Sequence, residues 1–404
     1  MNFESNPKKC AFFGECGGCA HQDLTYEEQL AQKQATLAEL FEDWWTDPIP
    51  ITPSPEIWNY RNKVDFNFGR KQYDEKPPDD FVRDTVLGFN KKGKWYWPLD
   101  IDECHIAPTT AKPIMDAVRK WYTDNGIHGM TNRNQDGILK VLLLREAKRT
   151  GQLMVVLITS PGELDEKSFV EAVESACPNV HSVYRGIHEG TSRGAFADEL
   201  ILLKGEASIQ ETLHIGDGED LRELSFRISP MSFFQTNSLA TELLYGEIRK
   251  WVKKIQPDIL YDLYGGAGGI AFSCSDLVKL VRSVEVVESA TLDGEDNAKQ
   301  NGIDNVFFMT STIKTYLQQM LEGGGMETNS AVVLDPPREG MTPKPLKRLI
   351  KTRPPHIIYV SCKPSVFAEE MKEFSQAYRL TSMQAVDLFP HTGHVELVAT
   401  MERK

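Results

Sequence analysis

The chain has 404 residues, of which 41% are hydrophobic and 25% charged, and this is the composition of an ordinary globular protein with two or three domains. The longest apolar runs, such as 141–144, are far too short to span a bilayer, and the polar start is unlike a secretory signal. We therefore expect a cytoplasmic protein, in which the seven cysteines are more often ligands or nucleophiles than disulfides. A net charge of −13 argues against a general nucleic-acid binder, although residues 51–150 carry a small positive excess that would suit a selective one.

The first half of the chain predicts a helix followed by a mixed domain. Residues 1–22 form a loop rich in cysteine and glycine, after which Thr25 and Glu28 resemble a capping box. Apolar residues then recur at helical spacing until a run of prolines: Leu30, Leu37, Phe41 and Trp44. Strand patterns at 63–68, 139–145, 153–159 and 200–204 alternate with helical patterns near 110–124 and 163–176. We interpret this region as an α+β domain.

The second half predicts a regular alternation of strands and helices. A strand at 224–228 precedes a helix at 238–252, and further strands follow at 259–263, 283–287, 331–334 and 357–361. This alternation predicts a parallel, doubly wound sheet covered by helices on both faces. The fold class is therefore α/β. We predict three domains, namely a cysteine-rich segment with its helix at 1–50, an α+β domain at 51–220 and a Rossmann-like domain at 221–404.

A glycine-rich turn, from Asp262 to Gly269, closes the predicted strand at 259–263 and opens a helix. Glycines there let the backbone approach a ligand at the carboxyl end of a strand, where open α/β sheets bind cofactors. Glu285 ends the next predicted strand and could accept hydrogen bonds from ribose hydroxyls. The glycine spacing does not match the dinucleotide fingerprint, which disfavours a nicotinamide cofactor. A tight structural turn is the alternative interpretation.

Two further strand ends carry chemically distinctive residues. Asp335 follows the strand at 331–334 and begins Asp-Pro-Pro-Arg, whose prolines stiffen the loop, although the same pattern could be a helix-capping turn. Cys362 follows the strand at 357–361, and Glu396 lies later in the chain. A thiol nucleophile and a carboxylate base are what covalent chemistry at a pyrimidine ring requires. A buried strand cysteine is the alternative for Cys362.

The amino-terminal cysteines have the spacing of a metal site. Cys10, Cys16 and Cys19 follow a C-x5-C-x2-C pattern within a glycine-rich loop, and Cys104 is the natural fourth ligand. By spacing alone, all-thiolate ligation allows structural zinc and an iron–sulfur cluster equally.

Two segments interleave aromatic and basic residues, as do proteins that stack bases and hold phosphates. The first contains Trp58, Tyr60, Arg61, Lys63, Phe66 and Phe68. The second contains Lys91, Lys92, Lys94, Trp95, Tyr96 and Trp97. For the second segment, a β-hairpin with an aromatic inner face and solvated lysines is an equally good interpretation.

Read together, the carboxyl-terminal motifs resemble the RNA uracil-C5 methyltransferase family, which makes 5-methyluridine in tRNA and ribosomal RNA. The matching blocks follow the family's order and are 226–237, 262–266, 297–301, Asp335-Pro-Pro-Arg, Val-Ser-Cys362 and the block that ends in Glu396. The segment 60–63 and the cysteine framework extend the resemblance to most of the chain.

The resemblance implies an enzyme with a role for each matching residue. Cys362 would be the nucleophile and Glu396 the general base. The methyl donor S-adenosyl-L-methionine would contact Gln235, Tyr264, Glu285 and Asp335. The four cysteines, Cys10, Cys16, Cys19 and Cys104, would hold a structural 4Fe-4S cluster.

The resemblance also implies an RNA substrate. The target base must leave its stack to reach Cys362, which costs least in a loop, so we expect a loop uridine. The chain begins shortly before Cys10, and we therefore expect it to lack the amino-terminal RNA-binding β-barrel of some members. This favours 23S ribosomal RNA over the tRNA T-loop as substrate, with tRNA as the alternative. We expect a monomer without a membrane partner.

Three positions depart from the family pattern. Gly265 stands where a cysteine is usual, and we expect this change to be harmless. Lys363 replaces a common asparagine beside the nucleophile, where its charge could help to ionise the thiol. Thr312 falls where an acid often contacts the adenine amine of the donor, so donor affinity could be lower.

Other classes of function are compatible with parts of the pattern. An RNA cytosine-C5 methyltransferase shares the covalent logic but uses different motifs around its cysteine. An amino-group methyltransferase also has an Asp-Pro-Pro loop but needs an aromatic residue where Arg338 stands, and it leaves Cys362 without a role. An RNA chaperone without enzymatic activity would have no need of Cys362 and Glu396.

Overall fold

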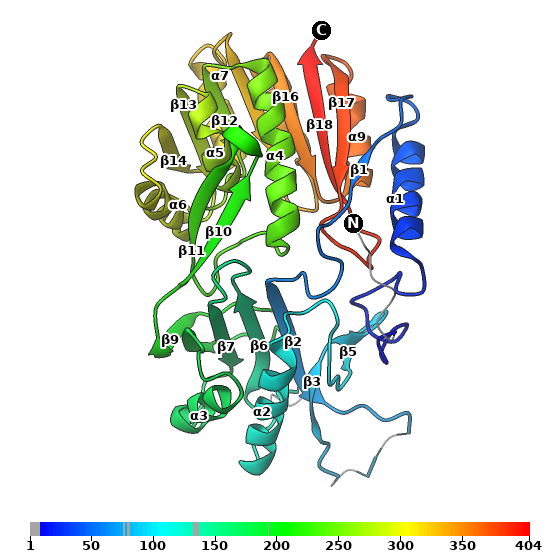
Figure 1. Cartoon of the computed structure of the whole chain (residues 1–404), viewed down its shortest axis with the longest axis vertical. Coiled ribbons are helices and arrows are strands. Elements are labelled where there is room, and N and C mark those ends of the chain that lie inside the picture. Colours follow the sequence, from blue (N-terminus) through cyan, green and yellow to red (C-terminus); the bar gives the residue numbers. More distant parts are fainter. Residues whose placement is uncertain (1–8, 76, 79–80, 132–136, 193) are drawn as a thin grey trace. The chain divides into compact units, whose positions relative to one another are not determined.

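The computed structural model describes residues 9–75, 77–78, 81–131, 137–192 and 194–404 (Figure 1). The chain divides by its contacts into two compact units. The first comprises Met1–Thr25, Ile57–Glu211 and Ile228–Met231, and the second comprises Tyr26–Glu56, Thr212–Arg227 and Ser232–Lys404. The functional division at 1–50, 51–220 and 221–404 stays a prediction beside this division by contacts.

The second unit contains an eight-stranded sheet in the order β1-β17-β18-β16-β15-β12-β13-β14. Its strands are β1 (Ile51–Thr52), β12 (Ile259–Leu263), β13 (Leu280–Glu285), β14 (Val306–Thr310), β15 (Ser330–Leu334), β16 (His356–Ser361), β17 (Tyr378–Val386) and β18 (Glu396–Arg403). Its helices are α1 (Tyr26–Phe41), α4 (Ser238–Ile255), α5 (Gly269–Cys274), α6 (Glu288–Gln300), α7 (Ile313–Glu322), α8 (Pro343–Thr352) and α9 (Pro364–Phe374), with a 3-10 turn at Ser275–Leu277. The predicted α/β fold class is confirmed, because β12 to β16 pair in parallel.

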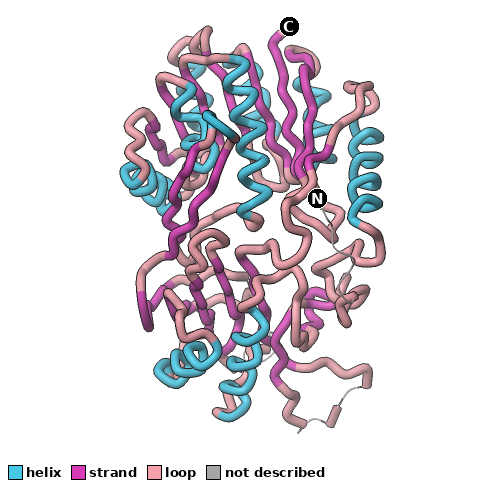
Figure 2. The backbone as a smooth tube through the Cα atoms, in the orientation of Figure 1, coloured by secondary structure: helices cyan, strands magenta, loops and turns pink. Residues whose placement is uncertain are grey.

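Hydrophobic cores on both faces of this sheet explain its unbroken apolar strands. In β12, Leu260 packs in the core shared with α4 and α5, whereas Tyr261 packs in the core shared with α1, α7, α8 and α9. Ile358 and Tyr359 of β16 alternate in the same way. Helices and strands therefore form three layers, as Figure 2 shows for the helices lying against the sheet. A parallel sheet needs this cover on both faces.

Sequence analysis missed several strands of this unit and misplaced one. The strand expected at 224–228 is β11 (Arg222–Ile228), and it pairs with β10 (Ile209–Ile215) in a separate two-stranded ribbon. The antiparallel strands β17 and β18 were not predicted, nor was the edge strand β14. β18 lies between β16 and β17 and is antiparallel to both.

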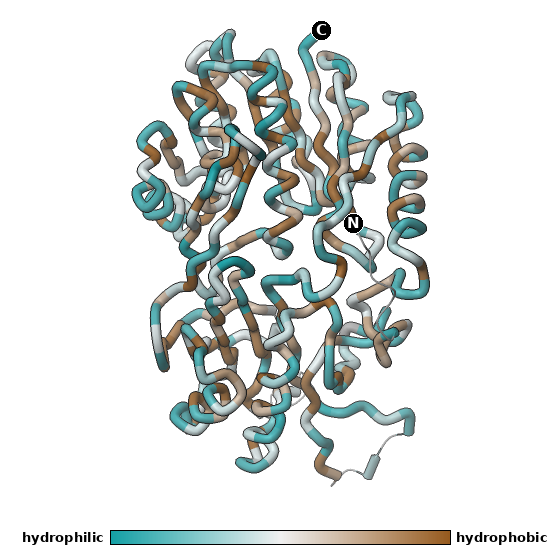
Figure 3. The backbone as a smooth tube through the Cα atoms, viewed as in Figure 1, coloured by the Kyte–Doolittle hydropathy of each residue, from teal (hydrophilic) through white to brown (hydrophobic). Residues whose placement is uncertain are grey.

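The first unit is an α+β layer. Its six-stranded sheet has the order β3-β2-β6-β7-β8-β9, and the helices α2 and α3 pack against it. The elements are β2 (Lys63–Arg70), β3 (Thr85–Gly88), α2 (Ala111–Asp124), β6 (Leu139–Glu146), β7 (Leu153–Thr159), α3 (Glu166–Ala176), β8 (Ser182–Ile187) and β9 (Glu199–Gly205). The strands β4 (Asn90–Lys91) and β5 (Lys94–Pro98) form a small hairpin. Figure 3 shows the hydrophobic colouring of β6 and β7, which are buried along nearly their whole length.

No helix among the described residues combines the length and the apolar character needed to cross a membrane.

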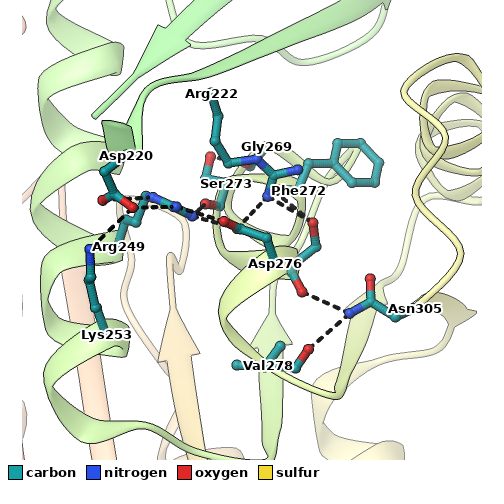
Figure 4. A network of polar contacts seen from close by, with 11 residues as sticks. Asp220, Arg222, Arg249, Lys253, Gly269, Phe272, Ser273, Asp276, Val278 and Asn305 are labelled. Carbon is teal, nitrogen blue, oxygen red and sulfur yellow. Dashed lines mark hydrogen bonds and ion pairs between the residues drawn. The ribbon is translucent and has the colours of Figure 1, made fainter. Parts of the chain in front are cut away.

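A polar network ties the β10–β11 ribbon to α4 and to the segment that follows α5 in the second unit (Figure 4). The guanidinium of Arg249 on α4 is 2% exposed and donates to Asp220 Oδ1 at 2.9 Å, Asp276 Oδ2 at 2.7 Å and the Ser273 carbonyl at 2.8 Å. Asp220 lies in the 3-10 turn Gly218–Asp220 just before β11, and Asp276 follows α5. Arg249 therefore ties the ribbon and α5 to α4.

We predict that Arg249→Met lowers the free energy of unfolding by about 1–3 kcal/mol, because it removes the buried cation from two carboxylates, which keep the more exposed Lys253 and Arg222 as partners. Hydrogen bonds from Arg249 hold the pKa of Asp220 below its ordinary value. Burial would raise the pKa of Asp276, but hydrogen bonds and charge from Arg249 hold that pKa low as well. This stability is present above the unfolded pKa of about 4 and is lost as the pH falls through the folded values. Urea unfolding at pH 7 and pH 3.5 should show a smaller difference in the variant than in the native protein.

The exposed Lys250→Met change is the matched control, because Lys250 contacts only Glu247 on the same helix. An Arg249→Met protein as stable as this control at pH 7 would contradict the prediction.

Candidate active site

The predicted catalytic and donor-binding residues lie at one edge of the eight-stranded sheet. Tyr264, Glu285, Asp335 and Cys362 stand at or directly after the carboxyl ends of β12, β13, β15 and β16. These strands are parallel neighbours, so their carboxyl ends meet. Ligands of doubly wound proteins bind at this edge.

Glu396 reaches the same edge because β18 runs the other way. Ser361, the last residue of β16, pairs with Leu397, so the next position on each strand brings Cys362 and Glu396 to the same end. Glu396 is also paired with Val386, the last residue of β17. An antiparallel strand thus carries the predicted base beside the predicted nucleophile.

The glycine turn forms a cradle with Glu285. Tyr264 has φ 69°, a left-handed conformation that is uncommon for a non-glycine residue and typical of functional sites. The Gly266 amide donates to Glu285 Oε2 at 3.1 Å, while Oε1 accepts from the amides of Val286 at 2.8 Å and Val287 at 2.9 Å. The carboxylate is therefore fixed in place, and its remaining lone pairs can accept ribose hydroxyls.

Gln235 is near Asp335. Its side-chain Nε2 lies 3.5 Å from Asp335 Oδ2, at the limit of a hydrogen bond. Gln235 is buried and precedes Asn237, whose side chain caps α4 by accepting from the Ala240 amide. The segment that contains Gln235 is thus fixed by the capped amino terminus of α4.

Burial dominates the electrostatics of this edge. It raises the pKa of Asp335 to about 7, and burial with the charge of Asp335 raises the pKa of Asp262 to about 7. Burial and then Asp335 raise the pKa of Glu396 well above its usual range. A carboxylate with a raised pKa is a stronger proton acceptor once it is ionised. Burial, followed by the charges of Glu396 and Asp335, raises the pKa of the Cys362 thiol to about 11.

The cation that favours ionisation here is Arg338 rather than Lys363. Arg338 lowers the pKa of both Cys362 and Glu396, against the larger effect of burial. Its guanidinium lies 2.9 Å from Nε2 of His394, on the loop before β18. The Lys363 side chain is exposed, and only its backbone amide binds locally, to Ser361 Oγ at 3.3 Å. The expectation that Lys363 helps to ionise the thiol is therefore not supported.

The other two departures have local structural roles. Thr312 caps α7, and its side-chain oxygen accepts from the Thr315 amide at 3.1 Å. An added Cβ at Gly265 would collide with Ser283 Oγ and lie 2.9 Å from Asp262 Oδ2. The Ser283 hydroxyl therefore lies where a side chain at residue 265 would begin, so a larger residue at 265 would require Ser283 to move.

Sequence analysis missed Glu370 on α9. This buried carboxylate accepts from the Met341 amide at 2.6 Å and from the Tyr359 hydroxyl at 2.7 Å. It therefore ties the end of the loop that begins at Asp335 to β16, the strand that carries Cys362. The available signal was a glutamate on the apolar face of a helix, between Phe367 and Phe374.

The four predicted metal ligands all belong to the first unit. The thiols of Cys16 and Cys19 both interact electrostatically with that of Cys104, and Cys104 and Cys16 interact with Cys10. Burial raises the pKa of all four thiols. Gly18 donates its amide to Cys16 Sγ at 3.3 Å. Within the described residues, however, no three His, Cys, Asp or Glu side chains are grouped as a metal site.

The two segments that interleave aromatic and basic residues differ in the exposure of their rings. Tyr60, Phe66 and Phe68 are fully buried, so the expectation that this first segment stacks on bases is wrong for these three rings. Alternate residues of β2 face the core, and the aromatic rings occupy those positions. In the β4–β5 hairpin, Tyr96 is 51% exposed, and the ammonium groups of Lys91 and Lys94 lie 5.3 Å and 4.6 Å from the Trp97 ring centre.

A doubly wound sheet with a glycine-rich turn and an acid at the carboxyl ends of neighbouring strands is the arrangement of the Rossmann-like methyltransferases. Comparison with known proteins agrees. Residues 194–404 match the family described as tRNA (Uracil-5-)-methyltransferase. An uncharacterised RNA methyltransferase of Chlorobaculum tepidum is 35% identical to this chain, and the alignment covers 98% of this chain and 82% of the relative. Another, of Caldanaerobacter subterraneus, is 32% identical, and the alignment covers 98% of this chain and 84% of the relative.

A solved structure extends the match to the whole fold. The tRNA (uracil-54, C5)-methyltransferase of Pyrococcus abyssi, in complex with S-adenosyl-L-homocysteine, is 27% identical with a TM-score of 0.73. The alignment covers 96% of this chain and 86% of that chain. The chain therefore belongs to the RNA uracil-C5 methyltransferase family and is an S-adenosylmethionine-dependent RNA methyltransferase.

We predict that Arg338→Met moves the pH dependence of methylation to higher pH. Arg338 favours the ionised forms of Cys362 and Glu396, so its loss raises both pKa values, and each unit costs about tenfold in the active form below the pKa. Single-turnover rates from pH 6 to pH 9.5 should fall most at low pH and recover in part at high pH. The exposed Lys344→Met is the control. An equal loss at every pH would show that Arg338 does not act through these pKa values.

Proposed function

We propose that this protein methylates C5 of a specific loop uridine in RNA through a covalent adduct between Cys362 and C6 of the uracil. The observation that carries the proposal is the register of β16 and β18, which brings Cys362 and Glu396 to the edge that also holds the donor-binding cradle. The family match supports the same reaction class.

The chemistry follows from the two side chains. The Cys362 thiolate adds to C6, and the ring electrons make C5 nucleophilic. C5 would take the methyl group from the sulfonium sulfur of the donor, whose S–C bond breaks, and S-adenosyl-L-homocysteine would leave with the bonding electron pair. Glu396 then takes the proton from C5, and loss of the thiolate from C6 restores the double bond. The ring regains its aromatic form, and the cysteine is free for another turnover.

Other residues of the edge would bind and orient the reactants. Gln235, Tyr264 and Glu285 would contact the donor, with Glu285 accepting from its ribose. Asp335 would lie beside both donor and base, because its carboxyl follows the middle strand of the edge. Pro336 and Pro337 would keep this loop rigid.

The proposed substrate is 23S ribosomal RNA, and the alternative is the uridine of the tRNA T-loop. The archaeal enzyme similar in structure acts, by its name, on uridine 54 of tRNA. Purified protein incubated with tritiated donor, tRNA and ribosomal RNA should place label in 5-methyluridine of the ribosomal fraction. Label in tRNA would overturn the substrate, and label in 5-methylcytidine, or none, would overturn the reaction.

The exposed face of the β4–β5 hairpin is the part of the first unit best suited to RNA. Exposed Tyr96 offers a ring for stacking, and Lys91 and Lys94 beside Trp97 offer charge for phosphates. Of the first segment, Trp58 and Arg61 keep partial exposure and stay candidates.

We also propose that Cys10, Cys16, Cys19 and Cys104 hold a 4Fe-4S cluster with a structural role. All-thiolate donors and amide hydrogen bonds to sulfur, as from Gly18, fit such a cluster. Anaerobically purified protein should contain iron and acid-labile sulfide in equal amounts. Cys104→Ser should lose both, whereas Cys177→Ser should not, because Cys177 lies outside this set. Zinc in place of iron would contradict the proposal.

We predict that Glu396→Gln traps a covalent protein–RNA complex and lowers turnover by roughly 10²–10⁴-fold, because methyl transfer proceeds and proton removal does not. Denaturing gels should show an RNA-dependent shifted band, which a further Cys362→Ala change removes. Cys362→Ala alone should give neither a shifted band nor methylation.

The control for Glu396→Gln is Glu402→Gln, a partly exposed change near the other end of β18. A Glu396→Gln protein that turns over normally would exclude Glu396 as the base. A Cys362→Ala protein that methylates RNA would exclude the covalent route.

A further inference from the structure

One face of helix α1 is buried, and the first half of that face is polar. The buried residues Tyr26, Gln29, Lys33, Leu37 and Phe41 recur every three or four positions. Leu37 and Phe41 pack in the hydrophobic core with α9, as expected of a buried face. The three residues before them are polar and yet at most 4% exposed.

Lys33 forms an ion pair with Asp387, the first residue after β17. Lys33 Nζ lies 2.7 Å from Asp387 Oδ1, and the two side chains are 3% and 0% exposed. Lys33 also donates to the Phe389 carbonyl at 3.1 Å. The Tyr26 hydroxyl donates to Asp387 Oδ2 at 3.0 Å, so both carboxylate oxygens are bound by α1.

Gln29 binds the same loop further along. Its side-chain oxygen accepts from the His391 amide at 2.8 Å, and its side-chain nitrogen lies 3.2 Å from His391 Nδ1. His391 is buried and has φ 66°, a left-handed conformation that costs free energy in a non-glycine residue. The two bonds from one glutamine hold the loop in this conformation.

This loop, residues 387–395, joins β17 to β18 and ends at Glu396. It is much longer than a tight hairpin turn, so pairing of the two strands does not fix its path. The contacts from α1 fall on both the backbone and the side chains of its first half. Figure 1 shows α1 beside β1, which pairs with β17 at this end of the sheet.

Stability alone is a poor explanation for this arrangement. Burying two charges costs free energy that their attraction only partly returns, and apolar residues of similar volume are often as stabilising. A buried ion pair with fixed partners does, however, select one conformation of the segment that it holds. The segment selected here leads directly into the predicted catalytic base.

We infer that Tyr26, Gln29 and Lys33 of α1 are positioning residues that hold the 387–395 loop and thereby aim the Glu396 carboxylate at C5 of the uracil. The inference rests on the proposed function, in which Glu396 removes the C5 proton. Displacement of a catalytic group by about 1 Å can cost on the order of 10²-fold in rate. Proton removal is therefore the step that depends on α1, whereas donor binding and thiol addition do not.

The test uses the full chain with Lys33→Met and with the double change Lys33→Met and Asp387→Leu. The single change leaves Asp387 buried without its cation and is expected to lower stability as well as activity. The double change removes both charges but leaves the Tyr26 hydroxyl and the Phe389 amide without their acceptor, so its thermal midpoint should fall, though less than that of the single change. Gln32→Met, on the exposed face of α1, is the matched control.

For the folded double variant we expect turnover to fall at least about tenfold, with the dissociation constant for S-adenosyl-L-homocysteine unchanged. The covalent protein–RNA band should increase during turnover, because proton removal slows after methyl transfer. Turnover equal to that of Gln32→Met would overturn the inference, and so would a loss of turnover without accumulation of adduct. Absence of methylation by the native protein would instead overturn the proposed function.

Discussion

The site depends on the reversal of one strand at the edge of a parallel sheet. Four of the parallel strands bring site residues to this edge at their carboxyl ends, and a parallel strand in the place of β18 would bring only another carboxyl end. Because β18 is antiparallel to β16, its first residue, Glu396, arrives there instead. The thiol and the base can then belong to neighbouring strands whose relative position is fixed by backbone hydrogen bonds. Such strands hold catalytic groups more precisely than two loops could.

The supporting residues act on the segments between these strands. Glu370 fixes the end of the loop that begins at Asp335, and the polar face of α1 fixes the loop before Glu396. In both cases a buried ionisable side chain makes one hydrogen bond to loop backbone and a second one to another side chain. Precision at the sheet edge therefore depends on polar groups inside the otherwise apolar core that α1 and α9 share. Loss of these polar groups should change the positions of the catalytic side chains before it changes the binding of the donor.

The fold class and most of the parallel strands could be predicted from sequence, because strands buried on both faces form continuous apolar runs. The antiparallel strands could not, since β17 and β18 contain threonine, glutamine and charged residues among their apolar ones. Of the apolar residues expected along α1, Leu37 and Phe41 are buried, but Leu30 is only partly buried and Lys33 is buried instead, because periodicity assigns apolar residues to the core. This rule fails where a buried ion pair places a lysine on the inner face of the helix. Conversely, the burial of Phe66 and Phe68 could have been predicted, because alternate residues of a strand face the same side and these two rings lie two positions apart.

The buried carboxyl groups of the edge are suited to a positively charged donor. Asp262, Asp335 and Glu396 share a buried region, and burial raises their pKa values, with a further rise for Asp262 and Glu396 from the charge of Asp335. A sulfonium donor carries a positive charge, and an opposite charge close by favours the ionised form of a carboxyl group or thiol. Binding of such a donor would thus lower the pKa of both the base and the nucleophile. A sulfonium therefore complements the charge of this edge better than a neutral ligand of similar shape would.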